Sequence, residues 1–498
     1  MLNSLRTRPL PPWLTPVRAV FLGSLLLSLI ARLGSTLNRD GMLYVKGAQA
    51  FLDGGFAAAR EVFNWPFLSI AMAVVAKITG LGLENAGHLL NAFFMAGACA
   101  LTVACVERRQ AELAWLAALV ALALPGLNEY RNELLREYGC WFFVILSLWL
   151  ALRWSESPRW ASAVAVQAAL GAAALFRPEA LALFPALLAW QFVAAPRADR
   201  RRRLLMLGAL PIAGAAALLA LYLGGHLSNG NRLADDLGRL SASRFDAKAQ
   251  ALASALIAYA REQARTILLF GSLALVPLKV LQKLGIFVVP LAFVFVSRQA
   301  RPTFSRHPLF AWGIAAHLLV LAVFVVDLQF LAGRYVGLIL LFSTPFVAAG
   351  LSLMLQRYPR WRPVLLVGAG LLMFANVVST GPGKTHLVDA GGWLAGNGAE
   401  STRTYIDSGR TAYHAGWQKA KIATRNQRAE VEQAIAEGRY ELYVLEHSRK
   451  DAPVEDWLTQ AGLRVVKRFD HPNGDAVIVA APIARIQVPE KPESAGNR

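Results

Sequence analysis

The sequence has few charged residues and few cysteines. Only 17% of its 498 residues are charged, against about 25% in a soluble globular protein, while 56% are hydrophobic. This balance argues against a water-soluble enzyme, and it excludes disorder, collagen and coiled coil. The three cysteines, Cys99, Cys105 and Cys140, all lie inside apolar runs. Because their number is odd and their spacing fits no metal site, we interpret them as packing residues.

Nucleotide-binding and nucleic-acid-binding signals are also lacking. No Walker or dinucleotide fingerprint is present, and the stretch 381–385 lacks the first glycine of a P-loop. Basic residues outnumber acidic ones by 51 to 32, giving a formal net charge of +19. The arginines, however, form small clusters at the ends of apolar runs, as membrane topology signals do. We therefore expect membrane lipid as a partner and no nucleic acid.

The long apolar runs predict a polytopic α-helical membrane protein with about eleven transmembrane helices. The first run, Val17–Leu33, is followed by no small-x-small cleavage site, so it is read as a retained helix and not as a signal peptide. The other ten spans are predicted at 86–106, 113–127, 138–153, 160–176, 180–195, 204–225, 284–297, 309–326, 335–354 and 362–379.

The arginine clusters orient these spans. Clusters such as Arg200–Arg203 fall in every second connection, so the positive-inside rule predicts a cytoplasmic N-terminus and, with eleven spans, a periplasmic C-terminus. The expected location is the inner membrane of a bacterium. Two further apolar stretches, 63–80 and 266–283, contain Pro66 and Pro277 and would reverse this pattern if they crossed. They are expected to be interfacial helices or re-entrant segments on the outer face.

The composition changes near residue 380. Residues 1–380 are predicted to form the transmembrane domain, and residues 381–498 a small soluble α/β domain with a disordered tail after Ile486. Strands are expected at Arg403–Ile406, Tyr440–Glu446, Leu463–Phe469 and Asp475–Ala480, and helices at Glu430–Glu437 and Val454–Ala461.

The first outer loop contains a candidate general base. Asp40 follows the first predicted span and stands next to Arg39, which favours the ionised carboxylate. A carboxylate at the membrane surface can take a proton from an acceptor hydroxyl or amine. The alternative is an ordinary loop aspartate that caps the following helix.

Three other outer segments carry charged residues. In residues 128–138, Arg131 and Arg136 could clamp a phosphate, and Glu137 could orient an acceptor, a metal or a partner cation. The alternative for this segment is a salt-bridged helix end. The second segment carries Arg177 with Glu179, an ion pair that is energetically costly near membrane depth unless it has a function or further partners. The third carries Arg334 with Tyr335, close to Asp327.

Several of these motifs, in this order, resemble the polytopic GT-C glycosyltransferases. They are Asp40 with Tyr44 after the first helix, the helix closed by Glu107–Arg109, the acidic loop that ends at Glu137, and the stretch Leu175–Leu181. The resemblance covers roughly residues 1–380. It is greatest to the bacterial branch related to protein O-mannosyltransferases and the lipid A aminoarabinose transferase. This chain has Asp-Gly where many members have Asp-Glu, so metal dependence is open.

The resemblance implies a polyprenyl-phosphate-linked sugar donor, an outward-facing active site and inversion at the anomeric carbon. Asp40 and Glu137 match the two catalytic acids of these enzymes, and Arg334 matches an outer-loop phosphate ligand. The residues expected to bind substrate are Arg39, Tyr44, Lys46, Arg131, Arg136, Arg177, Glu179, Arg334 and Tyr335.

The acceptor is left open between a lipid, a glycan and a protein. No cofactor is certain, although a divalent metal could take part. Two other functions stay open on the sequence alone. One is a transporter or flippase of a lipid-linked glycan, whose buried charges would line a path. The other is a non-enzymatic membrane scaffold whose C-terminal domain binds a partner.

Overall fold

The computed structural model describes residues 11, 13–33, 35–224, 242–375, 377–378, 383–417, 420–425, 427–451 and 453–483. The tail predicted to be disordered after Ile486 lies outside these residues. The chain divides into two compact units. The helical unit comprises Met1–Leu33 and Gly47–Val378, and the C-terminal unit comprises Gly34–Lys46 and Ser379–Arg498.

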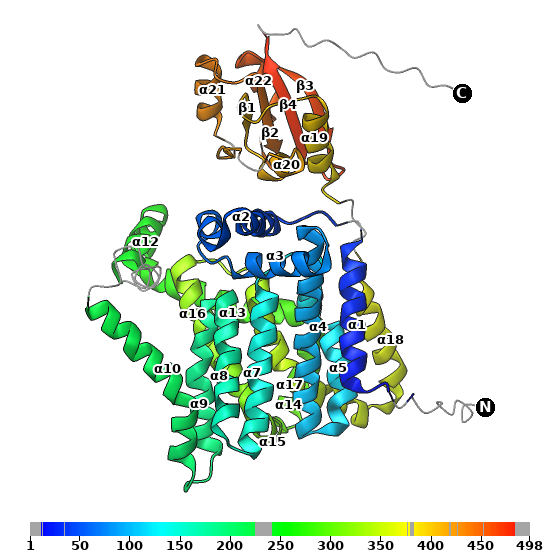
Figure 1. The fold of residues 1–498 in the computed structure, drawn as a ribbon. Helices are drawn as coiled ribbons and strands as arrows, with labels where there is room; N and C mark the ends of the chain where they lie inside the picture. Colours follow the sequence, from blue (N-terminus) through cyan, green and yellow to red (C-terminus); the bar gives the residue numbers. More distant parts are fainter. Residues whose placement is uncertain are drawn as a thin grey trace, which may run out of the picture. The chain divides into compact units, whose positions relative to one another are not determined.

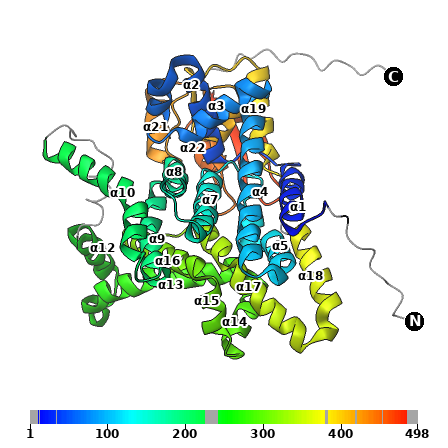
Figure 2. The same ribbon diagram turned by 60° about the horizontal axis from the view of Figure 1, so that its bottom comes forward.

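The helical unit is built from long helices joined by short turns. Its elements are α1 (Pro16–Arg32), α2 (Arg39–Val62, which begins in the C-terminal unit), α3 (Phe67–Thr79), α4 (Leu83–Arg109), η1 (Ala111–Leu113), α5 (Ala114–Ala123), α6 (Pro125–Asn128), α7 (Glu137–Glu156), α8 (Trp160–Phe176), η2 (Pro178–Ala182), α9 (Leu183–Ala194), α10 (Arg200–Leu223), α12 (Ala242–Ala255), η3 (Ala258–Gln263), α13 (Ala264–Leu284), η4 (Gly285–Phe287), α14 (Val288–Val296), α15 (Ala300–Arg306), α16 (Pro308–Leu328), η5 (Gly333–Val336), α17 (Gly337–Arg357), η6 (Pro359–Trp361) and α18 (Arg362–Ala375). Helices α1, α4, α7 and α8 pack side by side in that order (Figures 1 and 2).

A helix lies in each of the eleven predicted spans. Six helical stretches of the described chain are long and apolar enough to cross a membrane: Leu83–Arg109, Glu137–Glu156, Arg200–Leu221, Ala258–Val296, Pro308–Leu328 and Gly333–Arg357. The other predicted spans correspond to shorter apolar helices. The predicted polytopic helical membrane fold is confirmed.

Arg131 ties α1 to the loop after α6. This residue is buried, and its guanidinium donates to the carbonyl and hydroxyl of Ser24, at 3.0 and 2.9 Å, and to the hydroxyl of Ser28 at 3.0 Å. Its Nε donates to the side chain of Asn128 at 2.7 Å. A charged group among membrane helices needs such partners, so this network gives Arg131 a structural role.

The stretch 63–80 contains a helix too short to cross a membrane alone. α3 has 13 residues, or about 20 Å at 1.5 Å per residue, against about 30 Å of hydrocarbon. It packs on α4, across one end of the helical unit (Figure 1). The chain turns from α3 into α4 at Gly80, whose φ of 74° is the left-handed conformation of a helix C-cap.

The second ambiguous stretch, 266–283, forms most of α13. At its C-terminal end, Lys283 forms an ion pair with Glu129 in the loop after α6. At its N-terminal end, Arg265 lies 3.2 Å from Asp246 of α12. Helix α12 in turn contacts the C-terminal end of α16.

Both ends of α13 therefore lie near the connection between α16 and η5, because Gly333 of η5 adjoins Lys283 as well. The apolar run Ala258–Val296 is interrupted at Gly285, where φ is 55°. These contacts support a helix that lies along one end of the unit, followed by a separate short span, α14.

The C-terminal unit contains a four-stranded sheet. Its strands are β1 (Thr404–Ile406), β2 (Leu442–His447), β3 (Leu463–Asp470) and β4 (Ala476–Pro482), in the order β1-β2-β4-β3. The pair β1/β2 is parallel, and β2/β4 and β3/β4 are antiparallel. Its helices are α19 (Thr385–Gly396), α20 (Gly409–His414), α21 (Arg428–Ala436) and α22 (Glu455–Gln460).

The helices cover both faces of this sheet (Figure 1). Alternate residues of β1 point to opposite faces, so that Ile406 packs with α19 and α20 while Tyr405 packs with α21 and α22. The four predicted strands and two predicted helices are present, with ends shifted by one or two residues. Helices α19 and α20 were not predicted.

Candidate active site

Glu137 is the centre of a charged cluster in the helical unit. It is the first residue of α7, where the partial positive charge of the helix N-terminus favours a carboxylate. Its side chain is only 4% exposed. The Nη1 of Arg177 lies 2.6 Å from Glu137 Oε1, and the Nε of Arg334 lies 3.4 Å from the same oxygen.

Arg177 is held from three sides. It caps the C-terminus of α8, and its Nη2 donates to Glu179 Oε1 at 2.9 Å while Nη1 bonds Glu137. The ring of Tyr335 lies 4.5 Å from its Cζ, in cation–π geometry. These contacts fix the plane of the guanidinium.

Two glycines allow the helices to approach closely enough for these contacts. A Cβ on Gly139 of α7 would collide with the ring of Phe176, the residue before Arg177. A Cβ on Gly337, at the start of α17, would collide with Trp141 of α7. The small residues therefore bring the end of α8 and the start of α17 onto the first turns of α7.

The cluster borders a pocket with about 500 Å³ of space, including its open mouth. Polar atoms come from Glu137, Arg177, Glu179, His317, Arg334 and Tyr335, and apolar walls come from Cys140, Trp141, Ala180, Val320, Leu321, Phe324 and Leu338. The enclosed part of this space is small, about 40 Å³. With two acids and two arginines facing each other, the pocket can hold an anion against its guanidinium groups while apolar chain lies along its walls.

The structure brings five of the predicted site residues together: Glu137, Arg177, Glu179, Arg334 and Tyr335. It does not bring in Arg131, whose side chain binds α1 instead. Nor does Arg136 line the pocket, because its guanidinium lies 5.6 Å from the ring of Phe63.

The first-loop candidates lie in the other compact unit. Arg39, Asp40, Tyr44 and Lys46 all stand in the N-terminal part of α2, with Asp40 in its first turn. Tyr44 is buried, while Arg39 and Lys46 are exposed. The roles predicted for these four residues stay predictions.

His317 is a pocket residue that the sequence reasoning missed. It lies on α16, and its Nε2 is 3.0 Å from the carbonyl oxygen of Tyr335. The only signal was a polar side chain inside an otherwise apolar predicted span. As for a metal, no group of three or more His, Cys, Asp or Glu side chains is arranged to hold one within the described part of the chain.

Structural comparison finds a solved structure with the same fold. The chain matches the crystal structure of ArnT from Cupriavidus metallidurans bound to undecaprenyl phosphate, with a TM-score of 0.55, 14% sequence identity, and coverage of 93% of this chain and 97% of that chain. The chain has the fold of ArnT. A second structure of ArnT from the same organism, in the apo state, gives a TM-score of 0.42 at the same identity and coverage.

The match to ArnT agrees with the predicted helical membrane fold, and it spans almost the whole of both chains. Sequence comparison adds nothing to it: no protein-family model matches the chain, and no curated protein matches it significantly.

Proposed function

We propose that the chain is an integral-membrane inverting glycosyltransferase. It moves a sugar from a polyprenyl-phosphate donor to an acceptor outside the cytoplasm: a glycolipid, a polysaccharide or a protein. In the reaction, an acceptor oxygen or nitrogen attacks the anomeric carbon from the face opposite the phosphate. The bond from that carbon to the phosphate oxygen breaks, and its electron pair leaves with the polyprenyl phosphate. Asp40 takes the acceptor's proton.

The observation that carries this proposal is the pocket around Arg177. Arg177 and Arg334 offer guanidinium groups beside an apolar wall formed by Leu321, Phe324 and Leu338. A polyprenyl phosphate has the same two parts, an anionic head and an apolar chain. ArnT, which has the same fold, was crystallised with undecaprenyl phosphate bound.

The contacts of Arg177 suit it to a charge that grows during the reaction. The phosphodiester of the donor carries one negative charge, and the departing phosphate monoester carries more. A guanidinium already oriented by Glu137, Glu179 and Tyr335 loses little freedom when it binds this group. In this proposal the arginines hold the phosphate, and the two glutamates hold the arginines in place.

The localisation is part of the proposal. The chain lies in the inner membrane of a bacterium with its N-terminus in the cytoplasm and its C-terminal unit in the periplasm. Arg39, Tyr44 and Lys46 would then be available to bind substrate next to Asp40 on the outer side. A divalent metal is neither required by the reaction as written nor excluded.

The proposal is tested by glycan analysis of cells that lack the gene. Deletion should remove one sugar modification from the glycolipids, polysaccharides or glycoproteins of the envelope. The wild-type gene should restore it, and a gene carrying Asp40→Asn should not. Asp53→Asn, an exposed aspartate on the same helix, serves as the matched control and should restore it fully.

A purified assay separates transfer from transport. Proteoliposomes would contain the purified protein and a radiolabelled sugar linked to polyprenyl phosphate. Transfer would be measured as label in molecules that no longer carry the polyprenyl phosphate. An unchanged glycan profile in the deletion strain, together with altered transbilayer movement of the labelled donor, would refute the transferase and support the flippase.

A further inference from the structure

The C-terminal unit contains a second pocket, at the carboxyl ends of the parallel strands β1 and β2. It has a cavity volume of about 340 Å³, and it lies between the first turns of α21 and α22. Its lining residues are Tyr405, Asp407, Thr424, Gln427, Arg428, Val431, Leu445, Glu446, His447, Asp451, Val454 and Trp457. In α/β sheets, ligands commonly bind outside the carboxyl ends of the strands. The volume is within the usual range for ligand pockets.

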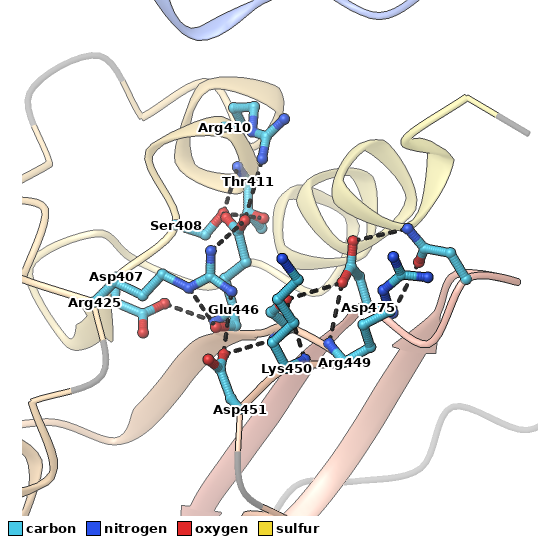
Figure 3. A network of polar contacts seen from close by, with 12 residues as sticks. Asp407, Ser408, Arg410, Thr411, Arg425, Glu446, Arg449, Lys450, Asp451 and Asp475 are labelled. Atoms are coloured by element: carbon cyan, nitrogen blue, oxygen red, sulfur yellow. Dashed lines mark hydrogen bonds and ion pairs between the residues drawn. The ribbon is translucent and has the colours of Figure 1, made fainter. Parts of the chain in front are cut away.

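Hydrogen bonds fix the acidic side of this pocket (Figure 3). Asp407 follows β1, and its Oδ1 accepts the backbone N–H of Glu446 at 2.7 Å. Arg425 lies 3.4 Å from the carboxylates of both Glu446 and Asp451, and Arg410 lies 3.1 Å from Glu446. The charges of Glu446 and Asp451 are thus balanced by arginines of the unit itself.

Asp407 has a different environment from these two acids. The pKa of its carboxyl is raised to about 7, mainly by burial; the hydrogen bond from the backbone N–H of Glu446 lowers the pKa, the charge of Glu446 raises it, and the charge of Arg425 lowers it. At neutral pH a large share of Asp407 is therefore protonated, and its carboxyl can both donate and accept a hydrogen bond.

A buried polar atom also lines the pocket. Tyr405 is 5% exposed, and its hydroxyl has no hydrogen-bond partner among the residues that the structure describes. A buried hydroxyl without a partner is unfavourable by about 1–3 kcal/mol. A ligand hydroxyl or a water that reaches it would remove this penalty.

The opposite wall presents an indole ring. Trp457 is half-buried, its Nε1 donates to Glu432 at 2.7 Å, and the guanidinium of Arg428 lies 5.1 Å from its ring centre. These two contacts hold the ring in one orientation at the pocket.

We propose that this pocket binds a neutral carbohydrate through hydroxyl contacts to Asp407, Tyr405 and Gln427 and apolar contact with Trp457. Three carboxyl groups in the lining disfavour an inorganic anion, and Arg428 with the arginines behind Glu446 disfavours a cation. Sugar hydroxyls both donate and accept, which matches a lining with both kinds of group. The C–H faces of a sugar ring match an aromatic surface.

The inference does not rest on the transferase reaction, because every residue named for it lies in the C-terminal unit and none belongs to the pocket around Arg177. It gives that unit a function of its own: retention of a glycan chain or a glycosylated acceptor.

The test uses the full chain in lipid nanodiscs free of sugar-based detergent. Saturation-transfer NMR would be recorded with glucose, galactose and N-acetylglucosamine as neutral probes, glucosamine as a cationic probe, and inorganic phosphate in competition. At least one neutral sugar should bind with a millimolar dissociation constant, the affinity expected of so small a ligand. Phosphate at equal concentration should not displace it.

Variants locate the binding. Trp457→Ala and Asp407→Ala should each weaken it at least tenfold, and Gln427→Ala, at an exposed rim position, should weaken it about threefold without disturbing buried contacts. Asp456 is exposed beside Trp457, and Asp456→Ala is the matched control for Asp407→Ala. It should leave binding unchanged, as should Glu179→Gln in the helical unit.

Three results would overturn the inference. The first is that no neutral sugar binds, whether or not phosphate or glucosamine binds. The second is undiminished binding in Gln427→Ala and Asp407→Ala. The third is loss of binding in Glu179→Gln only, which would assign the sugar to the helical unit. A failure of the transferase assay together with intact sugar binding here would refute the proposed function and leave this inference standing.

Discussion

Replacing Arg177 by methionine tests how the charged cluster of the helical unit is held together. The Glu137 side chain, 4% exposed, would lose its partner at 2.6 Å and keep only Arg334, whose Nε is 3.4 Å away. Breaking a buried ion pair by removing one partner costs about 3–5 kcal/mol. Because Arg334 still compensates part of the charge, we expect the lower end, about 3 kcal/mol.

A loss of this size is measurable as a shift in thermal unfolding. The entropy of unfolding is about 2.1 cal/mol/K per residue, so for the roughly 365 residues of the helical unit the melting temperature should fall by about 4 °C. Purified variants would be compared in one detergent by intrinsic fluorescence. Arg159→Met is the matched control, since Arg159 is exposed at the other end of the same helix and should change the melting temperature little.

The double variant Arg177→Met with Glu137→Gln separates charge from packing. With both charges gone, no charged carboxylate at position 137 is left without its partner, so much of the lost stability should return, while Glu179 and Arg334 each still lack one ion-pair partner. Transfer activity should not return, because the phosphate would still lack Arg177. Strictly additive losses of stability in the double variant, or an unchanged melting temperature in Arg177→Met, would contradict the ion-pair reasoning.

Three further changes have defined outcomes. Asp40→Asn should lower the transfer rate by at least about 100-fold without loss of membrane insertion. The rate is measured with purified protein, and Asp53→Asn is the control. Near-normal turnover of Asp40→Asn would remove Asp40 from the mechanism. The pKa of Asp407 is about 7 in the folded state and near 3.8 in the unfolded state, so the folded state binds more protons between these two pH values. The C-terminal unit should therefore lose stability as the pH rises from about 4 to 7. Asp407→Asn should abolish that loss and raise the free energy of unfolding by up to about 4 kcal/mol at pH 8. The measurement is hydrogen exchange of β1 and β2, corrected for intrinsic exchange rates. Equal protection of the two proteins at pH 8 would disprove the prediction. A reporter fused after Arg201 should read as cytoplasmic and one fused after residue 381 as periplasmic; a cytoplasmic signal at 381 would show a miscounted span.

Local patterns in the sequence were enough to predict most of the secondary structure. The strands of the C-terminal unit alternate apolar residues between clear turn signals such as Pro472-Asn473-Gly474, and all four were found. Helix α19 was missed because its sequence contains Gly391, Gly392 and Gly396, which lower intrinsic helix propensity. Gly391 is needed there for packing, since a Cβ would meet the side chain of His414 at 2.5 Å.

The sequence could suggest the members of the helical pocket but not their contacts. Arg177 and Glu179 are adjacent in the chain, so their pairing was predictable from spacing alone. That Glu137, 40 residues earlier, bonds the same guanidinium depends on how α7 and α8 pack. Arg131 was predicted to bind substrate from its place in an acidic loop, and nothing local revealed that its partners lie on α1.

The bonds between Arg131 and α1 also impose an order on how the protein is made. Ser24 lies eight residues before the end of α1, about 12 Å below it at 1.5 Å per residue, so the guanidinium is placed well inside the helical layer. The cell synthesises α1 more than 100 residues before Arg131. The hydroxyls of Ser24 and Ser28 therefore enter the membrane before Arg131 is synthesised. Arg131 can enter the apolar layer at a low free-energy cost only where α1 is already in place. Replacing both serines by alanine would then act during biogenesis, because Arg131 would lose both of its hydroxyl partners on α1.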